Sequence, residues 1–255
     1  MTSEVWLLGE PVSRSFSYAM QNAAFAAAGI DCRYVLHEVN REGLPTAIAN
    51  LRADSRILGA NVTIPHKESV IPLLDDLDPL AVRIGAVNTI SRQATRLKGW
   101  NTDAEGFRRA LDECGYIVEG RSTVIIGAGG AARAVGSVLQ PLARSVSVIS
   151  RNVVQAQRLS HDLGLAPDAP VDIERMQDVL TGADLVVNAT PADLPPRSSL
   201  RPDQRVFDVR SRRSAEGRSM LLHQGVAAFE IWTGKEPSVD AMRAALQQAA
   251  EAVTA

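Results

Sequence analysis

A short apolar strand, a glycine-rich turn and the start of a helix follow one another in Val124-Ile125-Ile126-Gly127-Ala128-Gly129-Gly130-Ala131-Ala132. Gly127, Gly129 and Ala132 fill the three small positions of the pattern Gly-x-Gly-x-x-Gly/Ala. The first glycine permits the turn, the second allows a pyrophosphate to approach the backbone, and the third small residue allows the helix to pack on the strand. Free N–H groups at the helix start then face the phosphate. The segment therefore predicts a dinucleotide site, and the alternative is a merely tight strand-to-helix turn.

Strand and helix patterns alternate along the chain, which predicts an α/β protein with mainly parallel sheets. We expect strands at Val5–Leu8, Tyr34–Val39, Ile57–Ile64, Thr123–Ile126, Val146–Ile149, Leu185–Asn188 and Val206–Val209, and a hairpin from Ala86–Ser91 and Arg96–Trp100. We expect helices at Ser17–Ala28, Leu44–Leu51, Asp103–Cys114, Ala131–Leu139, Val153–Leu163, Met220–Trp232 and Val239–Val253. A chain of 255 residues has room for two domains, and the border is expected within 101–120.

The charge balance and the cysteine content narrow the class of protein. Net charge is −2, from 27 basic and 29 acidic residues, which gives no electrostatic case for nucleic acid or an anionic membrane. The apolar runs are too short to span a bilayer, and the N-terminus lacks the layout of a signal peptide. Two cysteines, Cys32 and Cys114, indicate no disulfide framework, so a reducing, cytoplasmic setting is expected. The histidines show no metal-ligand spacing, and we assign no metal.

The stretch Asn61-Val62-Thr63-Ile64-Pro65-His66-Lys67 places an amide, a hydroxyl and an ammonium at the end of a strand. Side chains alternate along a strand, so Val62 and Ile64 are expected on one face, and Asn61 and Thr63 on the other. Pro65 has no N–H to donate and ends the strand. Lys67 would then lie in the first turn of a helix, where the dipole disfavours a cation and lowers its pKa toward neutrality. The alternative is a strand that ends in a solvated lysine.

Three further segments add polar side chains at expected strand ends. Ser15 and Ser17 follow the first strand and either cap the next helix or bind a polyol or carboxylate. Asn88 follows a tight turn, and Asp103 stands at a helix start, where the dipole favours its charged form. This inventory suits a small ligand with many hydroxyls and lacks an activated nucleophile with its base. Beside a nicotinamide site it indicates alcohol–carbonyl redox chemistry, in which a side chain takes the hydroxyl proton.

The choice of cofactor rests on Ser150 and Arg151, which end the second strand of the dinucleotide unit. An NAD site usually has an acid there for the ribose 2′-OH, whereas an arginine suits a 2′-phosphate. NADP is therefore expected rather than NAD, unless Arg151 is only a solvated loop residue. Asn188 and Thr190 stand at the end of the next strand. A contact with the cofactor and a structural role in capping the strand end are equally expected there.

With these pieces together, the chain resembles the shikimate/quinate dehydrogenase family. The matching motifs run in the family's order and cover nearly the whole chain: Gly9-x-Pro11 with Ser15-x-Ser17, Asn61-Val-Thr-x-Pro-x-Lys67, Gly85-Ala-Val-Asn88-Thr, Asn101-Thr-Asp103-x-x-Gly106-Phe107, Gly127-Ala-Gly-Gly-Ala-Ala132, Asn188-Ala-Thr-Pro191 and Gln224 to Gly234. The Asn-Val-Thr-x-Pro-x-Lys and Asn-Thr-Asp pieces are quite specific to this family.

The resemblance implies NADPH-dependent, reversible reduction of 3-dehydroshikimate to shikimate. It implies a substrate-binding domain at 1–103, on which the C-terminal helices 226–255 pack back, and a Rossmann-like NADP-binding domain at 104–225. Lys67 and Asp103 would be the catalytic pair. The implied substrate contacts, for a polyhydroxy cyclohexene carboxylate, are Ser15, Ser17, Asn61, Thr63, Asn88 and Gln224. The implied cofactor contacts are Gly127, Ala128, Gly129, Gly130, Ala131, Ser150, Arg151, Asn188, Thr190 and Met220.

The match departs from the family most clearly after Asp208. Ser211 stands where a tyrosine is expected, and a helix–strand unit that normally precedes the glycine turn and methionine is missing. Smaller departures are Arg14 for histidine, Tyr18 for proline and Asp193 for glycine. The replacement segment carries four arginines, Arg210, Arg212, Arg213 and Arg218. A solvated loop is the favoured interpretation of these residues, and a contact with a cofactor phosphate is the alternative.

Three questions stay open at the level of the sequence. The substrate is shikimate or a close analogue such as quinate or aminoshikimate, which differ by groups that only a few side chains sense. The alternative to the enzyme is a weakly active or non-catalytic NADP- or metabolite-binding paralogue, which the shortened segment favours and Lys67 with Asp103 disfavours. The protein is expected to be a monomer or a homodimer.

Overall fold

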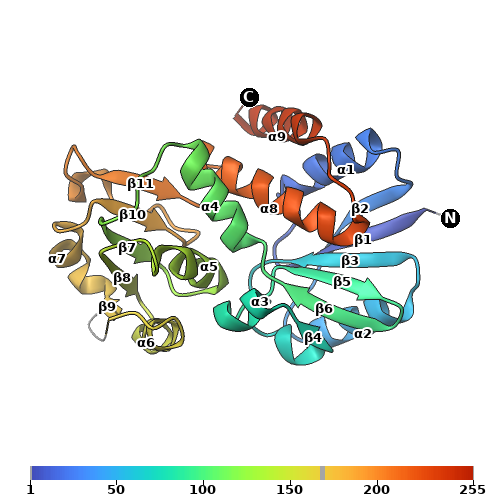
Figure 1. The fold of residues 1–255 in the computed structure, drawn as a ribbon, viewed down its shortest axis with the longest axis horizontal. Helices are drawn as coiled ribbons and strands as arrows, with labels where there is room; N and C mark the ends of the chain where they lie inside the picture. The colour runs from blue at the N-terminus through green and yellow to red at the C-terminus, as the bar shows by residue number, and fades with distance from the viewer. Residues whose placement is uncertain (1, 167–169, 255) are drawn as a thin grey trace. The chain divides into compact units, whose positions relative to one another are not determined.

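The computed structural model describes residues 2–166 and 170–254 and has the expected mixed α/β class (Figure 1). The chain divides into two compact units. The first comprises Met1–Val82, Ala86–Gly106 and Leu221–Ala255, and the second comprises Arg83–Gly85 and Phe107–Met220. Borders fall inside three helices, α3 (Pro79–Ile84), α4 (Asp103–Glu113) and α8 (Ala215–Thr233), each of which contributes residues to both units.

The sheet of the first unit has the strand order β2-β1-β3-β5-β6-β4. Its strands are β1 (Ser3–Gly9), β2 (Cys32–Glu38), β3 (Ile57–Val62), β4 (Asp76–Leu77), β5 (Thr89–Gln93) and β6 (Arg96–Trp100). β1, β2 and β3 run parallel, while β5 and β6 form the expected antiparallel hairpin. Asn61 at the end of β3 pairs with Thr89 at the start of β5, and Thr89 pairs with Trp100 at the end of β6. The predicted polar segments therefore meet at one edge of this sheet.

Helices cover both faces of this sheet, as the alternation of side chains along β1 requires. Val5 and Leu7 lie in a core with residues of α1 (Ser17–Ala27), α8 and α9 (Val239–Thr254). Leu8 lies in a second core with residues of α2 (Leu44–Ala53) and α3 (Pro79–Ile84). Alanine-rich α1 ends at Ala27, and Gly29 follows it with a positive φ of 62°, which suits glycine.

The sheet of the second unit is entirely parallel, with the order β11-β10-β7-β8-β9. Its strands are β7 (Ser122–Ile126), β8 (Ser145–Ser150), β9 (Pro170–Asp172), β10 (Leu185–Asn188) and β11 (Arg205–Asp208). α5 (Gly130–Leu139) and α6 (Val153–Asp162) pack on one face with Ile125, while α7 (Met176–Leu180) packs on the other with Val124 and Ile126. The order changes direction between β7 and β10, which is where doubly wound sheets bind dinucleotides.

Two sequence-based expectations are wrong around Lys67. The strand expected at Ile57–Ile64 ends at Val62, and Ile64 does not share a strand face with Val62 as expected: Val62 is buried and Ile64 is exposed. No helix begins at Lys67; turns lead to a short 3-10 helix, η1 (Ile71–Leu73). A helix dipole therefore does not act on Lys67 from its own segment.

Other differences from expectation concern short elements and the start of α8. β4, α3, β9, α7 and two further 3-10 turns, η2 (Ile173–Arg175) and η3 (Arg197–Ser199), were not expected, and such short elements carry little periodic signal. α8 begins at Ala215 rather than Met220, because Ser214 accepts a hydrogen bond from Gly217 N at 2.8 Å and starts the helix earlier.

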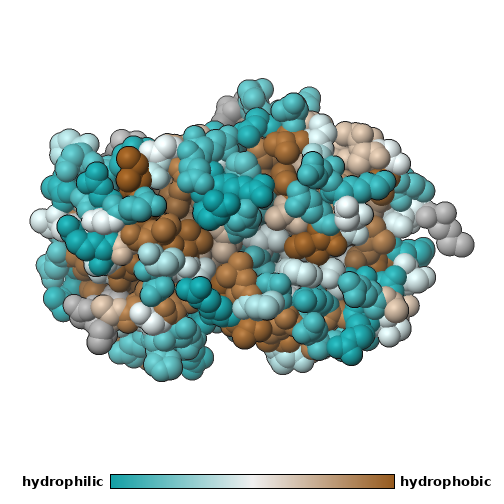
Figure 2. Space-filling view, in the orientation of Figure 1, coloured by the Kyte–Doolittle hydropathy of each residue, from teal (hydrophilic) through white to brown (hydrophobic). Residues whose placement is uncertain are grey.

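Within residues 2–166 and 170–254, no helix combines the length and apolar character needed to cross a bilayer. Hydrophilic residues cover most of the face drawn in Figure 2, with hydrophobic residues visible between them.

Candidate active site

Lys67 and Asp103 form a direct ion pair. Lys67 lies in the turn after β3 and Asp103 begins α4; Lys67 Nζ and Asp103 Oδ2 are 2.5 Å apart. The side chains are only 14% and 8% exposed. Little solvent screens such a pair, and removing either partner would leave a largely buried, uncompensated charge. The predicted catalytic pair is thus brought together within the first unit.

Asn88 connects this pair to its surroundings. Its Nδ2 donates to Asp103 Oδ1 at 3.0 Å and to Thr102 Oγ1 at 2.9 Å, and its Oδ1 accepts from Thr102 N at 2.7 Å. Both oxygens of the Asp103 carboxylate therefore have a partner. The arrangement fixes the direction in which the carboxylate holds the Lys67 ammonium.

Gln224, from α8, approaches the same amide through longer contacts. Asn88 Nδ2 lies 3.3 Å and Thr102 Oγ1 lies 3.4 Å from Gln224 Oε1. An amide nitrogen has two hydrogens, so Asn88 cannot serve Asp103, Thr102 and Gln224 at once. Gln224 is the partner with the longest contacts. Its carbonyl oxygen can therefore exchange these contacts for a hydrogen bond from a ligand hydroxyl at little cost in free energy.

Asn61 is fully occupied by protein partners. Tyr34 Oη donates to Asn61 Oδ1 at 2.7 Å, while Asn61 Nδ2 donates to Thr89 Oγ1 at 3.0 Å and to Asn88 O at 3.1 Å. Tyr34 is completely buried, and this burial raises the pKa of its hydroxyl, which keeps it a donor. Through these contacts Asn61 supports Asn88 from below. A direct contact between Asn61 and a ligand stays a prediction.

Thr63 lies directly after β3, whereas Ser15 lies in the loop between β1 and α1, and Ser17 is the first residue of α1. Thr63 N donates to Leu8 O at 2.9 Å, and a Cβ atom at Gly9 would overlap Thr63 Cγ2, so glycine is needed for β1 and the turn after β3 to approach. Ser15 Oγ accepts from Ser17 N at 3.2 Å, while α1 has no side-chain cap at its N-terminus. The capping alternative therefore does not hold for the hydroxyl of Ser17, the first residue of α1.

The glycine turn of the second unit has the geometry that its pattern predicts. Gly127 has a φ of +116°, and a Cβ atom there would lie 3.0 Å from Ala189 O. A Cβ atom at Gly129 would meet no protein atom within 4 Å, and no side chain caps the N-terminus of α5. Open space in front of free N–H groups fits a pyrophosphate. Ala128, Gly130 and Ala131 complete this turn and helix start.

The other predicted cofactor residues of the sheet lie at strand ends of the same unit. Ser150 ends β8 and accepts from Asn152 N at 3.1 Å, and Arg151 beside it is exposed. Asn188 ends β10, is completely buried, and holds Thr190 through Thr190 N at 3.1 Å and Thr190 Oγ1 at 2.8 Å. Asn188 therefore holds the loop after β10, which agrees with the alternative that it caps the end of the strand.

Met220 is placed differently from the other predicted cofactor residues. It is buried in the core of the second unit, in a cluster that also contains Phe207 and Tyr116. Its side chain has a packing role there, and its contact with a cofactor stays a prediction.

Sequence comparison assigns the family. Three family models match the chain: the shikimate dehydrogenase substrate binding domain at residues 7–90, shikimate/quinate 5-dehydrogenase at 110–201, and the shikimate 5′-dehydrogenase C-terminal domain at 217–247. A shikimate dehydrogenase (NADP(+)) of Moorella thermoacetica is 42% identical over 278 residues, covering 97% of this chain and 94% of the relative. The chain belongs to the shikimate dehydrogenase family.

Solved structures of the family have the same fold. Shikimate 5-dehydrogenase of Thermus thermophilus, in complex with NADP(H) and shikimate, is 32% identical with a TM-score of 0.82, covering 97% of this chain and 100% of that one. Quinate dehydrogenase of Corynebacterium glutamicum, in complex with NAD, is 30% identical with a TM-score of 0.83, covering 97% and 99%.

This member of the shikimate dehydrogenase family is shorter than the Moorella relative. The alignment with the Moorella protein has 278 positions, more than the 255 residues of this chain, so the relative contains residues without a counterpart here. β11 is the last strand of its sheet and leads directly to α8. Its edge carbonyls are satisfied by side chains: Val206 O accepts from Tyr116 Oη at 2.7 Å and Asp208 O from Ser214 Oγ at 2.6 Å. These bonds replace part of what a neighbouring strand would supply.

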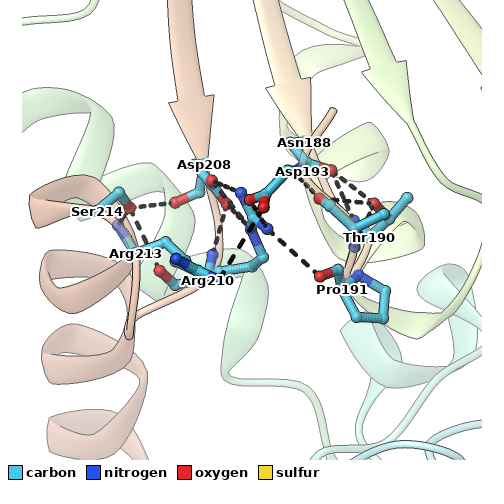
Figure 3. Close-up of polar contacts among 10 residues, drawn as sticks. Asn188, Thr190, Pro191, Asp193, Asp208, Arg210, Arg213 and Ser214 are labelled. Carbon is cyan, nitrogen blue, oxygen red and sulfur yellow. Dashed lines mark hydrogen bonds and ion pairs between the residues drawn. The ribbon is translucent and has the colours of Figure 1, made fainter. Parts of the chain in front are cut away.

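One arginine of the segment after β11 is not solvated as predicted. The side chain of Arg210 is 17% exposed and pairs with Asp208 and Asp193 (Figure 3), whereas Arg213 is exposed. Proximity to two carboxylates outweighs solvation for Arg210, and raises the pKa of its guanidinium.

Sequence reasoning missed Tyr34 in the network around Asn88, and it included Thr89 in the Gly-Ala-Val-Asn-Thr motif without a role, which the bond from Asn61 now supplies. Tyr34 is buried on β2 next to exposed Arg33, and a buried hydroxyl requires a partner, but the partner lies on β3 and only the fold reveals it. Thr102 was included in the Asn-Thr-Asp motif without a role, which its bonds to Asn88 now supply.

Proposed function

We propose that the chain catalyses the reversible, NADP-dependent reduction of 3-dehydroshikimate to shikimate. The observation that carries this proposal is the 2.5 Å contact between Lys67 Nζ and Asp103 Oδ2, with Asn88 holding the second carboxylate oxygen. A lysine fixed in this way can, as the ammonium, donate a proton to the reacting oxygen during reduction and, as the neutral amine, take the proton back during oxidation. When bound, NADPH supplies the hydride. Relatives from Moorella thermoacetica and Methanopyrus kandleri, the latter 40% identical, are both named for this activity.

The first unit would hold the substrate. Lys67 would exchange the proton at the reacting oxygen, and Asp103 would orient Lys67 and hold a neighbouring hydroxyl. The carboxylate and other ring hydroxyls of a polyhydroxy cyclohexene carboxylate would bind to the polar groups at the same sheet edge, Ser15, Ser17, Asn61, Thr63, Asn88 and Gln224. Gln224 Oε1 has only contacts of 3.3 Å and longer in this network, which supports a role in ligand binding.

The second unit would hold NADP. The open space at Gly129 and the uncapped start of α5 suit the pyrophosphate, and Arg151 at the end of β8 suits a 2′-phosphate rather than a 2′-OH. The Corynebacterium quinate dehydrogenase was solved with NAD, so the family uses both cofactors, and Arg151 is the residue that favours NADP here.

A reducing compartment suits the thiols of this chain. Cys32 and Cys114 are free, and burial raises the pKa of Cys32 to about 12, which leaves the thiol protonated and unreactive. The cytoplasm is the compartment we expect.

The test is a matrix of substrate and cofactor. Shikimate and quinate are each oxidised with NADP and with NAD, and formation of the reduced nicotinamide is followed by its absorbance. The largest kcat/KM is expected for shikimate with NADP. A larger kcat/KM for quinate or for NAD would assign the chain a different substrate or cofactor preference within the same family.

The same assay separates the enzyme from a non-catalytic paralogue. Binding of NADPH and shikimate by calorimetry without turnover would contradict the enzyme. The contact between Lys67 and Asp103 favours turnover, because a paralogue that only binds needs no largely buried ammonium against a carboxylate.

A further inference from the structure

The turn between β11 and α8 is tightly built around the backbone of Arg210. Ser214 Oγ donates to Asp208 O at 2.6 Å and accepts from Gly217 N at 2.8 Å. A Cβ atom at Gly217 would lie 2.6 Å from the carbonyl carbon of Arg210, so only glycine allows the first turn of α8 to pack here. The direction in which the Arg210 side chain leaves the backbone is therefore fixed by the shortened segment itself.

The guanidinium of Arg210 joins the ends of two neighbouring strands (Figure 3). Its Nε lies 2.8 Å from Asp208 Oδ1, and a terminal nitrogen lies 2.5 Å from Asp208 Oδ2, at the end of β11. The other terminal nitrogen lies 2.6 Å from Asp193 Oδ1 and 3.3 Å from Pro191 O, in the loop after β10. Most donors of the guanidinium are thus taken by protein acceptors, which leaves little for a cofactor phosphate.

The loop that Arg210 holds also contacts the glycine turn. Asn188 Nδ2 donates to Ala192 O at 2.8 Å and Asn188 Oδ1 accepts from Thr190 N, which fixes the loop from the β10 side. Ala189 O lies 3.0 Å from the position of a Cβ atom at Gly127. The loop is therefore attached to β10 through Asn188, to β11 through Arg210, and rests against the turn where the pyrophosphate is expected.

We propose that Arg210 is a positioning residue for the nicotinamide half of the cofactor. This rests on the proposed function. β8 and β9 lie on one side of β7, and β10 and β11 on the other, so the two halves of a dinucleotide bind over different pairs of strands. Arg151, suited to the 2′-phosphate, follows β8 and marks the adenosine side. The loop of Pro191 and Asp193 then belongs to the nicotinamide side, and Arg210 holds it in place where the resemblance implies a further helix–strand unit.

The test compares two ligands that share the adenosine half, NADPH and adenosine 2′,5′-bisphosphate. Dissociation constants are measured by calorimetry for the wild type, Arg210→Ala and Arg210→Lys. Loss of charge-assisted hydrogen bonds predicts that Arg210→Ala binds NADPH about tenfold more weakly. Binding of the bisphosphate is expected to stay unchanged, and Arg210→Lys, which keeps one charged donor group, should recover part of the loss.

Two further variants guard against a general effect on folding or charge. Asp193→Asn breaks the same ion pair from a side chain that is 73% exposed, and it should reproduce a weakened affinity for NADPH only. Arg213→Ala removes the same charge from the same segment. Arg213 also pairs with Asp193, but at 4.0 Å and from a side chain that is 65% exposed, so this weak pair predicts that neither affinity changes by more than about twofold.

Each result decides the proposal. Equal losses for both ligands, or unchanged affinity for NADPH in Arg210→Ala, would overturn the positioning role while leaving the cofactor assignment intact. A wild type that binds neither ligand would overturn the cofactor assignment and, with it, this role.

Discussion

Replacing Tyr34 with phenylalanine tests whether the buried network beneath Asn88 is needed for stability and catalysis. The substitution removes only the hydroxyl that donates to Asn61 Oδ1 at 2.7 Å and leaves that buried oxygen without this partner. An unsatisfied buried polar group costs about 2 kcal/mol. For a chain of this size each kcal/mol lowers the melting temperature by about 2–4 °C, so a decrease of about 4–8 °C is expected.

The same substitution should reach the active site. Asn61 fixes Thr89 and the backbone carbonyl of Asn88, and Asn88 holds Asp103, so loss of the Tyr34 bond loosens the carboxylate that orients Lys67. We expect kcat/KM for shikimate to fall about tenfold, because small misplacements of catalytic groups are costly.

The assay is a thermal melt together with steady-state kinetics, with Tyr18→Phe as the control. Tyr18 is 52% exposed, and removal of its hydroxyl should change stability by less than about 0.5 kcal/mol. If Tyr34→Phe melts like the control, the hydroxyl of Tyr34 is not needed for stability. A lowered melting temperature with unchanged kcat/KM would show that the network supports the fold but not the site.

Three further predictions concern single contacts. Arg151→Ala should weaken binding of NADP about tenfold without changing that of NAD, as calorimetry would show, because only NADP has the 2′-phosphate. Gln224→Ala should raise KM for shikimate more than it lowers kcat, since its contacts to the protein are long; equal effects in steady-state kinetics would contradict a substrate contact. The hydrogen bond from Arg133 lowers the pKa of Asp162, so its charged form stabilises the fold above the unfolded-state pKa and the benefit is lost as pH falls through the folded-state pKa. Thermal melts should show Asp162→Asn less stable than the wild type at pH 7, with the difference vanishing in acid.

The sequence predicted the sheet edge of the site well, for a physical reason. Asn61 and Asp103 stand near the carboxyl ends of β3 and β6, and Asn88 directly precedes β5, which runs antiparallel between them, so the expected hairpin brings all three together. The glycine turn was predicted equally well, since Gly127 needs a positive φ and a close approach that few other residues allow.

The parts that sequence could not supply depend on long-range pairing. The partner of Tyr34 lies on a strand far along the chain, and nothing in either segment identifies it. The helix expected at Lys67 was wrong because local pattern gave no sign that the chain would continue in turns. The charge density of the segment after β11 suggested solvation, but the short turn directs Arg210 toward Asp193, which only the adjacency of β10 and β11 makes possible.

The central claim is that Lys67 moves the proton at the reacting oxygen. It is tested most directly by single-turnover reduction of 3-dehydroshikimate with excess Lys67→Ala enzyme and NADPH, with Lys98→Ala as the control. Lys98 is a lysine of the same unit that pairs with Asp76 away from this network. Loss of a general acid predicts a rate constant at least about a hundredfold lower for Lys67→Ala, with Lys98→Ala close to the wild type. A near-normal rate in Lys67→Ala would contradict the account.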